Sequence, residues 1–457
     1  MPEKEGSQEP PKIATEFDDM AEFNAEINDV GYARYNYKEL LEREANITEM
    51  IEGAADTALF NSGAAAMHSA IEAEGLKEGD VVFCAEAVYD TTKSDIKQLE
   101  KLGIKVVFFD STDMPGLQEL IEKERPRLII AESIANSKKM EVTDLEKLGS
   151  ITQETNEHYQ RDFSPEKVLA NLLSNKGKLK EITPETQNLI LNLIEEYRQG
   201  QNPLVFRKAI RQIEQETGLG REDTMRELSR IIKRIIGDSR EILSLIIDNT
   251  LPSPQLLNPL VTLRDHDVKK VIVESGTKHY QEGANEITLG LAYSDDPEKI
   301  QAIKSRRIEL GTYLQPTDER RIPETIYKTM PEIMKNHARN ALELAHALSE
   351  IPGFEVSHPN LPENKQSEVV NILAPEGAVT LFYVTLPEKI TGEEFMQKIK
   401  DAAGEKIGLG SSFGHIKTWL SNYALDSRTV RIAAGSESEK DFQEVLNIFQ
   451  KVAETLK

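Results

Sequence analysis

Short apolar runs separated by helical patterns constrain the fold of this chain more than any other feature. In chain order the runs lie at residues 81–83, 106–109, 128–131, 243–247 and 271–273. Strands that are apolar on both faces belong to sheets that helices cover on both sides. The sequence therefore predicts an α/β fold with a mostly parallel sheet and helices on both of its faces.

One long segment inside this α/β pattern lacks strand-like runs. Three helix starts place a capping side chain before a proline, at Ser164-Pro165, Thr183-Pro184 and Asn202-Pro203. From Arg221 to Ile236 apolar side chains recur at spacings of three and four, which makes one apolar helix face. We therefore expect an all-helical insert at residues 152–240.

The rest of the chain divides around this insert. The first residues lack sustained periodicity and predict a flexible arm. Beyond residue 325, helical and strand-like segments predict a smaller α+β domain. The expected parts are an N-terminal arm (1–30), the first part of a large domain (31–151), the helical insert (152–240), the second part of the large domain (241–325) and a C-terminal small domain (326–457).

Charge and cysteine content narrow the class of partner. The chain has 457 residues and a net charge of −23, which argues against nucleic acid or an anionic membrane as its main partner. Cys84 is its one cysteine, so we expect no internal disulfide and a reducing, cytoplasmic location. No apolar run approaches the roughly 20 residues of a membrane helix. The eight histidines show no zinc-binding spacing, so we expect no metal.

A lysine and an aspartate follow two of the predicted strands. Asp248 ends one run, and Lys278 follows the next, directly behind Ser275 and Thr277. Open α/β sheets bind ligands at the carboxyl ends of their strands. There the pair suits pyridoxal phosphate, because a lysine forms a Schiff base with its aldehyde and an aspartate keeps its ring nitrogen protonated. Taken alone, Asp248 is equally well explained as a helix cap and Lys278 as a solvated lysine.

A glycine turn and two hydroxyl groups are candidates to bind the cofactor phosphate. Ser62-Gly63-Ala64 opens a helical pattern, where backbone N–H groups and the helix dipole face an anion. Ser275 and Thr277 would add hydroxyl donors beside Lys278. Most such glycines only make a turn, so this hypothesis depends on the other site residues.

Two further residues would complete such a site. Tyr89 follows a predicted strand and is a candidate to stack on the cofactor ring, although a partly buried tyrosine is common there. Arg431 lies in an apolar strand-like run and is a candidate to bind a substrate carboxylate with two hydrogen bonds. A structural ion pair explains an arginine in that place equally well.

Taken in order, these segments resemble the Cys/Met-metabolism (trans-sulfuration) family of fold-type-I pyridoxal-phosphate enzymes, which includes cystathionine γ-synthase. The resemblance covers roughly residues 32 to 450, and many motifs in the family's order make it specific. The similar segments are Tyr32-Ala33-Arg34-Tyr35-Asn36, Ser62-Gly63-Ala64-Ala65, Glu132-Ser133-Ile134-Ala135-Asn136, Asp248-Asn249-Thr250, Asn258-Pro259-Leu260, Ser275-Gly276-Thr277-Lys278, Ser412-Phe413-Gly414 and the stretch from Arg431 to Glu437.

The resemblance implies a role for each matching residue. Lys278 and Tyr89 would be catalytic, and Asn136, Ser412 and Arg431 would bind the substrate. Tyr32 and Arg34 would reach the cofactor of a neighbouring subunit. The cofactor would be pyridoxal 5′-phosphate, and the chain's own cofactor-binding residues would be Ser62, Gly63, Ala64, Tyr89, Asn136, Asp248, Thr250, Ser275, Thr277 and Lys278.

The activity that the resemblance implies is β- or γ-elimination, or γ-replacement, on an amino acid derived from cysteine, methionine or homoserine. Lys278 would remove the proton from the substrate's α carbon. The implied partners are this substrate and further copies of the chain, in a homodimer or homotetramer. Another fold-type-I enzyme, such as an aminotransferase, is an alternative. A non-catalytic relative that acts through its helical insert is a second one.

Some segments depart from the family pattern. The family's G-H-S-D after the lysine is here Gln281-Glu282-Gly283-Ala284-Asn285-Glu286, and Lys417 stands where many members have glutamate. Residues 421–423 replace the family's H-P-A stretch. Because these segments line substrate pockets in relatives, the sequence constrains the cofactor more than the substrate.

Overall fold

The computed structural model describes residues 37–162, 169–170, 173, 182–198, 204–239, 242–423 and 425–456. These residues form two compact units, one from the segments up to Ser150 and from Ser244 onward, the other from Ile151 to Leu243. The expected N-terminal arm lies outside the described residues. So do the expected helix starts at Ser164-Pro165 and Asn202-Pro203.

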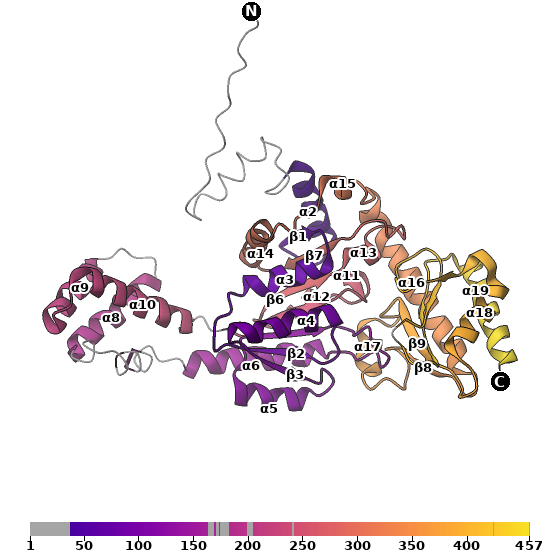
Figure 1. Cartoon of the computed structure of the whole chain (residues 1–457), viewed down its shortest axis with the longest axis horizontal. Helices are drawn as coiled ribbons and strands as arrows, with labels where there is room; N and C mark the ends of the chain where they lie inside the picture. The colour runs from indigo at the N-terminus through magenta and orange to yellow at the C-terminus, as the bar shows by residue number, and fades with distance from the viewer. Residues whose placement is uncertain are drawn as a thin grey trace, which may run out of the picture. The chain divides into compact units, whose positions relative to one another are not determined.

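A seven-stranded sheet forms the centre of the first unit (Figure 1). Every neighbouring pair from β6 to β3 is parallel, whereas β7 runs antiparallel to both β1 and β6. The predicted α/β class with a mostly parallel sheet is therefore confirmed. In spatial order the strands are β1 (Asp56–Phe60), β7 (Gly290–Ser294), β6 (Lys269–Glu274), β5 (Ser244–Asp248), β4 (Leu128–Glu132), β2 (Val81–Ala85) and β3 (Lys105–Phe109).

Helices cover both faces of this sheet, which explains why its central strands are apolar throughout. All five residues of β4 are buried, as are the first four of β5. Figure 1 shows α4 and α5 on opposite sides of β2 and β3. The helices of this domain are α2 (Lys38–Met50), α3 (Gly63–Ala73), α4 (Asp90–Leu99), α5 (Met114–Glu124), α6 (Leu145–Asp162), α11 (Ser253–Leu256), α12 (Pro259–Thr262), α13 (Gly276–His279), α14 (Pro297–Leu310) and α15 (Pro316–Glu319).

A smaller, five-stranded sheet belongs to the same unit. Its strands are, in spatial order, β10 (Gly408–Leu409), β11 (Trp419–Ser421), β12 (Thr429–Ala433), β9 (Leu381–Thr385) and β8 (Glu355–Ser357). Phe382 on β9 packs with Phe395 and Phe449 in a core that the sheet shares with its helices. These helices are α16 (Ile326–Ser349), α17 (Ser367–Leu373), α18 (Gly392–Ala403) and α19 (Glu439–Thr455).

The second unit is helical over the residues that the structure describes. Its helices α8 (Pro184–Arg198), α9 (Leu204–Thr217) and α10 (Arg221–Ser239) follow α6, which begins in the first unit. Apolar side chains such as Ile190, Ile213 and Leu228 close a core of their own. The side chain of Asn156 donates to the carbonyl of Leu243 over 3.2 Å and accepts from its N–H over 2.7 Å, so the two ends of the unit are joined.

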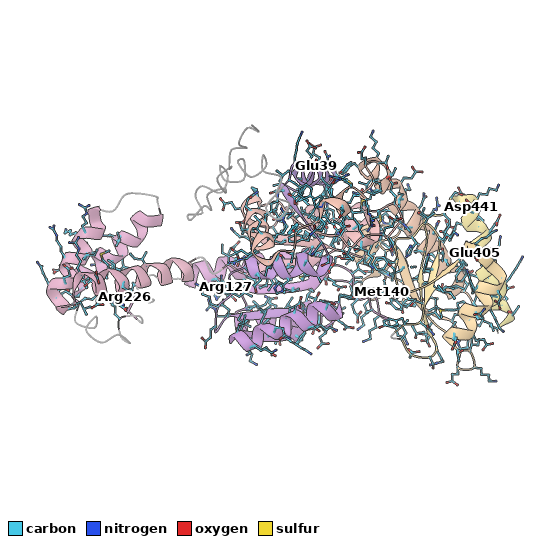
Figure 2. The ribbon with its side chains drawn as sticks, turned by 45° about the horizontal axis from the view of Figure 1, so that its top comes forward. Glu39, Arg127, Met140, Arg226, Glu405 and Asp441 are labelled. Atoms are coloured by element: carbon cyan, nitrogen blue, oxygen red, sulfur yellow. The ribbon has the colours of Figure 1, made fainter. Side chains whose placement is uncertain are left out.

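Charged side chains project from the surface of both units. Glu39, Glu405 and Asp441 project from the first unit, and Arg226 projects from α10 of the second (Figure 2). Among the described residues, no helix has both the length and the apolar character that crossing a membrane requires.

Candidate functional site

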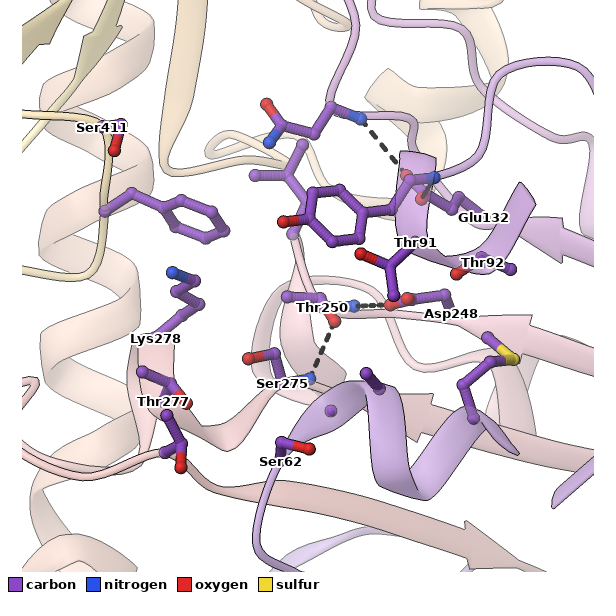
Figure 3. Close-up of a pocket in the computed structure, with 18 of the residues that line it drawn as sticks. Ser62, Thr91, Thr92, Glu132, Asp248, Thr250, Ser275, Thr277, Lys278 and Ser411 are labelled. Atoms are coloured by element: carbon purple, nitrogen blue, oxygen red, sulfur yellow. Dashed lines mark hydrogen bonds between the residues drawn. The ribbon is translucent and has the colours of Figure 1, made fainter. Parts of the chain in front are cut away.

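A cavity of about 390 Å³ lies where β4, β5 and β6 end. Its volume falls in the range of small-molecule sites, and both sheets contribute to its wall. Figure 3 shows Lys278, Ser275 and Ser62 on one side of this space and Asp248 and Glu132 on the other. The predicted site residues in its lining are Ser62, Gly63, Ala64, Tyr89, Asn136, Asp248, Thr250, Ser275, Thr277, Lys278 and Arg431.

Lys278 lies on the short helix α13, which starts where β6 ends. Its Nζ donates to the Ser412 hydroxyl over 3.2 Å and lies 5.2 Å from the centre of the Phe413 ring. Burial, together with the nearby guanidinium of Arg431, lowers the pKa of Lys278. Because a lower pKa increases the unprotonated fraction of an amine, this shift favours Lys278 as a nucleophile and as a base. Ser412 is thus placed beside Lys278, although it is not part of the cavity wall.

Asp248 and Glu132 are neighbours at the ends of adjacent strands. The register pairs Glu132 on β4 with Asp248 on β5. Burial raises the pKa of Asp248, whose carboxylate accepts the Thr250 N–H over 2.9 Å. Among the described residues no cation pairs with Asp248. A buried carboxylate without a cation is a suitable partner for a protonated ring nitrogen.

Glu132 also organises the rim of the cavity. One carboxylate oxygen accepts the backbone N–H of Tyr89 over 2.7 Å, and the other accepts that of Asn136 over 3.2 Å. Burial, reinforced by the nearby Asp248, raises the pKa of Glu132 to about 8. The side chain of Tyr89 remains 62% exposed, so the open face of this residue is free to meet a ligand.

The N-terminus of α3 meets the end of β6 closely. A Cβ added to Gly63 would lie 2.9 Å from the Ser275 Cβ, so only glycine allows this approach. The Ser62 hydroxyl caps the helix by accepting the Ala65 N–H over 3.1 Å. The first backbone N–H groups of α3 therefore border the cavity, where an anion such as a phosphate would be stabilised.

The hydroxyl groups near Lys278 differ in their engagement. The Ser275 N–H donates to the Thr250 hydroxyl over 2.8 Å. The Thr277 hydroxyl accepts the Leu289 N–H over 2.9 Å and donates weakly to the Leu289 carbonyl over 3.4 Å. Thr277 therefore lines the cavity while its hydroxyl ties α13 to the segment before β7.

Arg431 reaches the cavity from β12 of the small sheet. Its guanidinium donates to the Ser411 carbonyl. Its buried Nε has no hydrogen-bond partner among the described residues. A buried guanidinium donor without an acceptor fits a carboxylate from a substrate.

Sequence reasoning missed several residues that the structure places here. Glu132 opens a segment that resembles the family, but the sequence assigned it no role. Its hydrogen-bond partners are backbone N–H groups, which a sequence pattern does not reveal. Tyr383 on β9 was part of an apolar strand pattern, yet its hydroxyl donates to the Asn136 Oδ1 over 2.9 Å. Thr91, Asp95 and Phe413 also line the cavity. Tyr32 and Arg34, expected to serve a neighbouring subunit, lie outside the described residues.

Comparison with known proteins gives a match over most of the chain. Residues 10–159 and 226–445 match the family described as Cys/Met metabolism PLP-dependent enzyme. The residues between them, most of the second unit, fall outside this match.

Two curated relatives share shorter segments. The chain is 26% identical over 226 residues to a cystathionine beta-lyase of Neurospora crassa, which covers 46% of each protein. It is 32% identical over 125 residues to a probable cystathionine gamma-synthase 2 of Arabidopsis thaliana, covering 27% of this chain and 30% of the relative. The chain thus matches less than half the length of these relatives.

Solved structures share the fold over nearly the whole chain. A cystathionine gamma-lyase from Lactobacillus plantarum complexed with L-serine has a TM-score of 0.63 and 16% identity, covering 93% of this chain and 88% of that one. A cystathionine gamma synthase from Xanthomonas oryzae pv. oryzae, in complex with aminoacrylate and cysteine, has the same TM-score, identity and coverage. At this identity the likeness establishes the fold.

Proposed function

The chain belongs to the family of Cys/Met metabolism PLP-dependent enzymes, and from this premise we propose that it catalyses β- or γ-elimination, or γ-replacement, on a sulfur-containing amino acid or a homoserine derivative. Pyridoxal 5′-phosphate is the cofactor of this family. The observation that carries the proposal is that Lys278, Asp248 and Arg431 line the same cavity.

The residues of the cavity fit this cofactor. Asp248 would bind its ring nitrogen, the N-terminus of α3 with Ser62 and Ser275 its phosphate, and Lys278 its aldehyde carbon. Tyr89 would lie against its ring. When bound, the cofactor supplies an acceptor for the electrons that remain when a proton leaves the substrate's α carbon.

The chain's own groups would bind and deprotonate the substrate. Arg431 would hold the α-carboxylate through its free Nε, with Asn136 and Ser412 beside it. The Lys278 amine would then take the α-proton, a role that its lowered pKa supports. For γ-chemistry the same amine would move a proton at the β carbon. Tyr89 would give a proton to the leaving sulfur or oxygen.

The proposal also includes the oligomeric state of the protein and its location in the cell. A homodimer or homotetramer would bring Tyr32 and Arg34 of one copy to the cofactor of another. The buried thiol of Cys84 is consistent with a reducing compartment such as the cytoplasm. The names of the curated relatives favour cystathionine and related amino acids as substrates.

Replacement of the lysine tests the proposal. The wild-type protein, loaded with pyridoxal phosphate, is supplied with cystathionine, methionine, cysteine and O-acylhomoserines, and keto acid, ammonia and thiol are measured. Lys278→Ala should abolish turnover and the yellow absorbance of the bound cofactor. Lys335→Ala, which breaks an exposed ion pair with Glu376, is the control and should keep both. Full activity of Lys278→Ala would refute the proposal.

The same panel separates the alternative activities. An aminotransferase would leave the amino group on the cofactor, so it would release keto acid without ammonia. A non-catalytic relative would form no product from any of these amino acids. If the chain catalyses elimination, we expect ammonia and keto acid in equal amounts. If it catalyses γ-replacement, O-acylhomoserine and cysteine supplied together should be consumed without release of ammonia.

A further inference from the structure

A tyrosine of the small sheet touches both residues that are expected to hold the substrate carboxylate. Tyr383 lies on β9 and pairs in register with Arg431 on β12. Its hydroxyl donates to the Asn136 Oδ1 over 2.9 Å and lies 3.3 Å from the Asn136 backbone carbonyl. Asn136 follows β4 of the large sheet, so this bond joins the two sheets at the edge of the cavity.

The bond from Tyr383 determines which end of the Asn136 amide faces the cavity. A side-chain amide has an acceptor oxygen at one end and two N–H donors at the other. Because the tyrosine hydroxyl takes the oxygen, the NH₂ group is left for the cavity, and within the described residues it has no other partner. A carboxylate only accepts hydrogen bonds, so this orientation attracts it and the flipped orientation would repel it.

The rest of the environment keeps the tyrosine in this role. The Tyr383 side chain is buried, and burial raises the pKa of its hydroxyl, which therefore remains a donor. The neighbouring Arg431 guanidinium, a hydrogen-bond partner of the same hydroxyl, opposes this shift. At the other end of Asn136, its backbone N–H is held by Glu132. Asn136 is thus held at its backbone by the large sheet and at its side chain by the small sheet.

We propose that Tyr383 is a positioning residue, which holds the Asn136 amide with its N–H donors toward the cavity beside Arg431 and so sets the affinity for the substrate carboxylate. The inference rests on the proposed function, because it needs an amino acid bound in this cavity. Tyr383 itself would not touch the reacting atoms.

A double-mutant cycle tests this role. L-Alanine, which has no leaving group on its β carbon, is titrated into the protein loaded with pyridoxal phosphate, and its dissociation constant is read from the change in cofactor absorbance. Tyr383→Phe should weaken alanine binding about tenfold, the effect of one lost hydrogen bond to a group that binds a charge. Asn136→Ala should weaken it by at least as much. In the double variant, Tyr383→Phe should add less than twofold, because the residue through which it acts is gone.

Two control variants separate positioning from a structural role. Asn364→Ala removes another hydrogen bond to the segment after β4, from the Asn364 side chain to the Met140 carbonyl over 3.0 Å. Tyr313→Phe removes a tyrosine hydroxyl that does not belong to the cavity wall. Both should leave the alanine dissociation constant within twofold of the wild-type value. The cofactor absorbance before titration should be the same in all variants.

The possible outcomes distinguish the two proposals. If the wild-type protein shows no absorbance change with alanine, the proposed function fails, and this inference with it. If the wild-type protein responds but the effects of Tyr383→Phe and Asn136→Ala multiply in the double variant, the proposed function survives and the positioning role is refuted. An unchanged dissociation constant in Tyr383→Phe would refute it as well.

Discussion

The large and the small sheet reach the same cavity with different kinds of side chain. The large sheet contributes buried carboxyl groups at its strand ends, Glu132 and Asp248, together with Lys278 and the glycine turn before α3. The small sheet contributes the Arg431 guanidinium, and its Tyr383 hydroxyl bonds Asn136 in the cavity wall. The first set suits the cofactor and the second suits an amino-acid carboxylate. Variants should therefore separate into those that change cofactor chemistry and those that change substrate affinity.

The largest effect is expected from Asp248→Asn on the large sheet. Asparagine can keep the bond from the Thr250 N–H but has no charge for the ring nitrogen. Losing one partner of a buried charge pair costs about 3–5 kcal/mol, so kcat/KM should fall roughly 10²- to 10⁴-fold, mainly through kcat. Asp110→Asn is the control, because Asp110 follows β3 and accepts the Thr112 N–H over 2.8 Å outside the cavity. An unchanged kcat in Asp248→Asn would contradict the assignment.

Arg431→Ala on the small sheet should act mainly on the substrate. Removing a buried partner of a substrate carboxylate costs about 3 kcal/mol, so kcat/KM should fall roughly 100-fold, mainly through KM. The cofactor absorbance should not change. Arg428→Ala, which removes a bond to the Leu386 carbonyl away from the cavity, should keep the wild-type KM. If Arg431→Ala lost the cofactor, the assignment of cofactor binding to the large sheet and substrate binding to the small sheet would be wrong.

Gly63→Ala should weaken the cofactor without altering the preference among substrates. The added Cβ would lie 3.0 Å from the Ser275 Cα, so α3 and the end of β6 must move apart. Overpacking of this kind costs about 1–3 kcal/mol, and cofactor affinity measured by absorbance titration should fall about tenfold. Gly220→Ala in the second unit meets nothing within 4 Å and should bind the cofactor normally. Equal affinities would show that the close approach is not needed for the phosphate.

The smallest effect concerns Glu274, the last residue of β6, which accepts the Tyr293 hydroxyl over 2.5 Å. Burial raises the pKa of Glu274 from 4.5 to about 8. The folded state therefore holds an extra proton between these values, and the stability that this proton provides below pH 4.5 is lost as the pH rises toward 8. Thermal unfolding should show that Tm falls less between pH 5 and pH 9 in Glu274→Gln than in the wild-type protein. The difference between the two falls should be roughly 2–4 °C. If the Tm of the wild-type protein and of the variant changed equally with pH, the raised pKa of Glu274 would be contradicted.

The sequence predicts the parts of the site that follow strands with a strong pattern. β4, β5 and β6 are apolar runs buried on both faces, so the positions of Asp248 and Lys278 at their ends could be inferred. β7 could not, because G-L-A-Y-S is short, contains glycine and pairs antiparallel with β6 and with β1, which lies far away in the sequence. Pattern reasoning places a residue on an element, but it does not select its partner across the fold.

Within the site, the sequence does not reveal which groups the side chains bind. Glu132 acts through the backbone N–H groups of Tyr89 and Asn136, and backbone groups carry no sequence signal. The Tyr383 hydroxyl meets a residue 247 positions away. The Thr277 hydroxyl accepts the Leu289 N–H, a bond that forms only when α13 packs beside the segment before β7. The roles predicted for the site residues remain predictions that the variants above can test.

The bonds between Asn156 and Leu243 have a consequence for the history of the gene. They bring the start and the end of the second unit together, and the chain re-enters the first unit at Ser244, the start of β5, whereas the cavity lies at the other end of that strand. A coding segment gained, lost or exchanged between these two points would leave the order of the strands intact. We therefore expect that a foreign domain could replace the segment between these two points without disturbing the sheet.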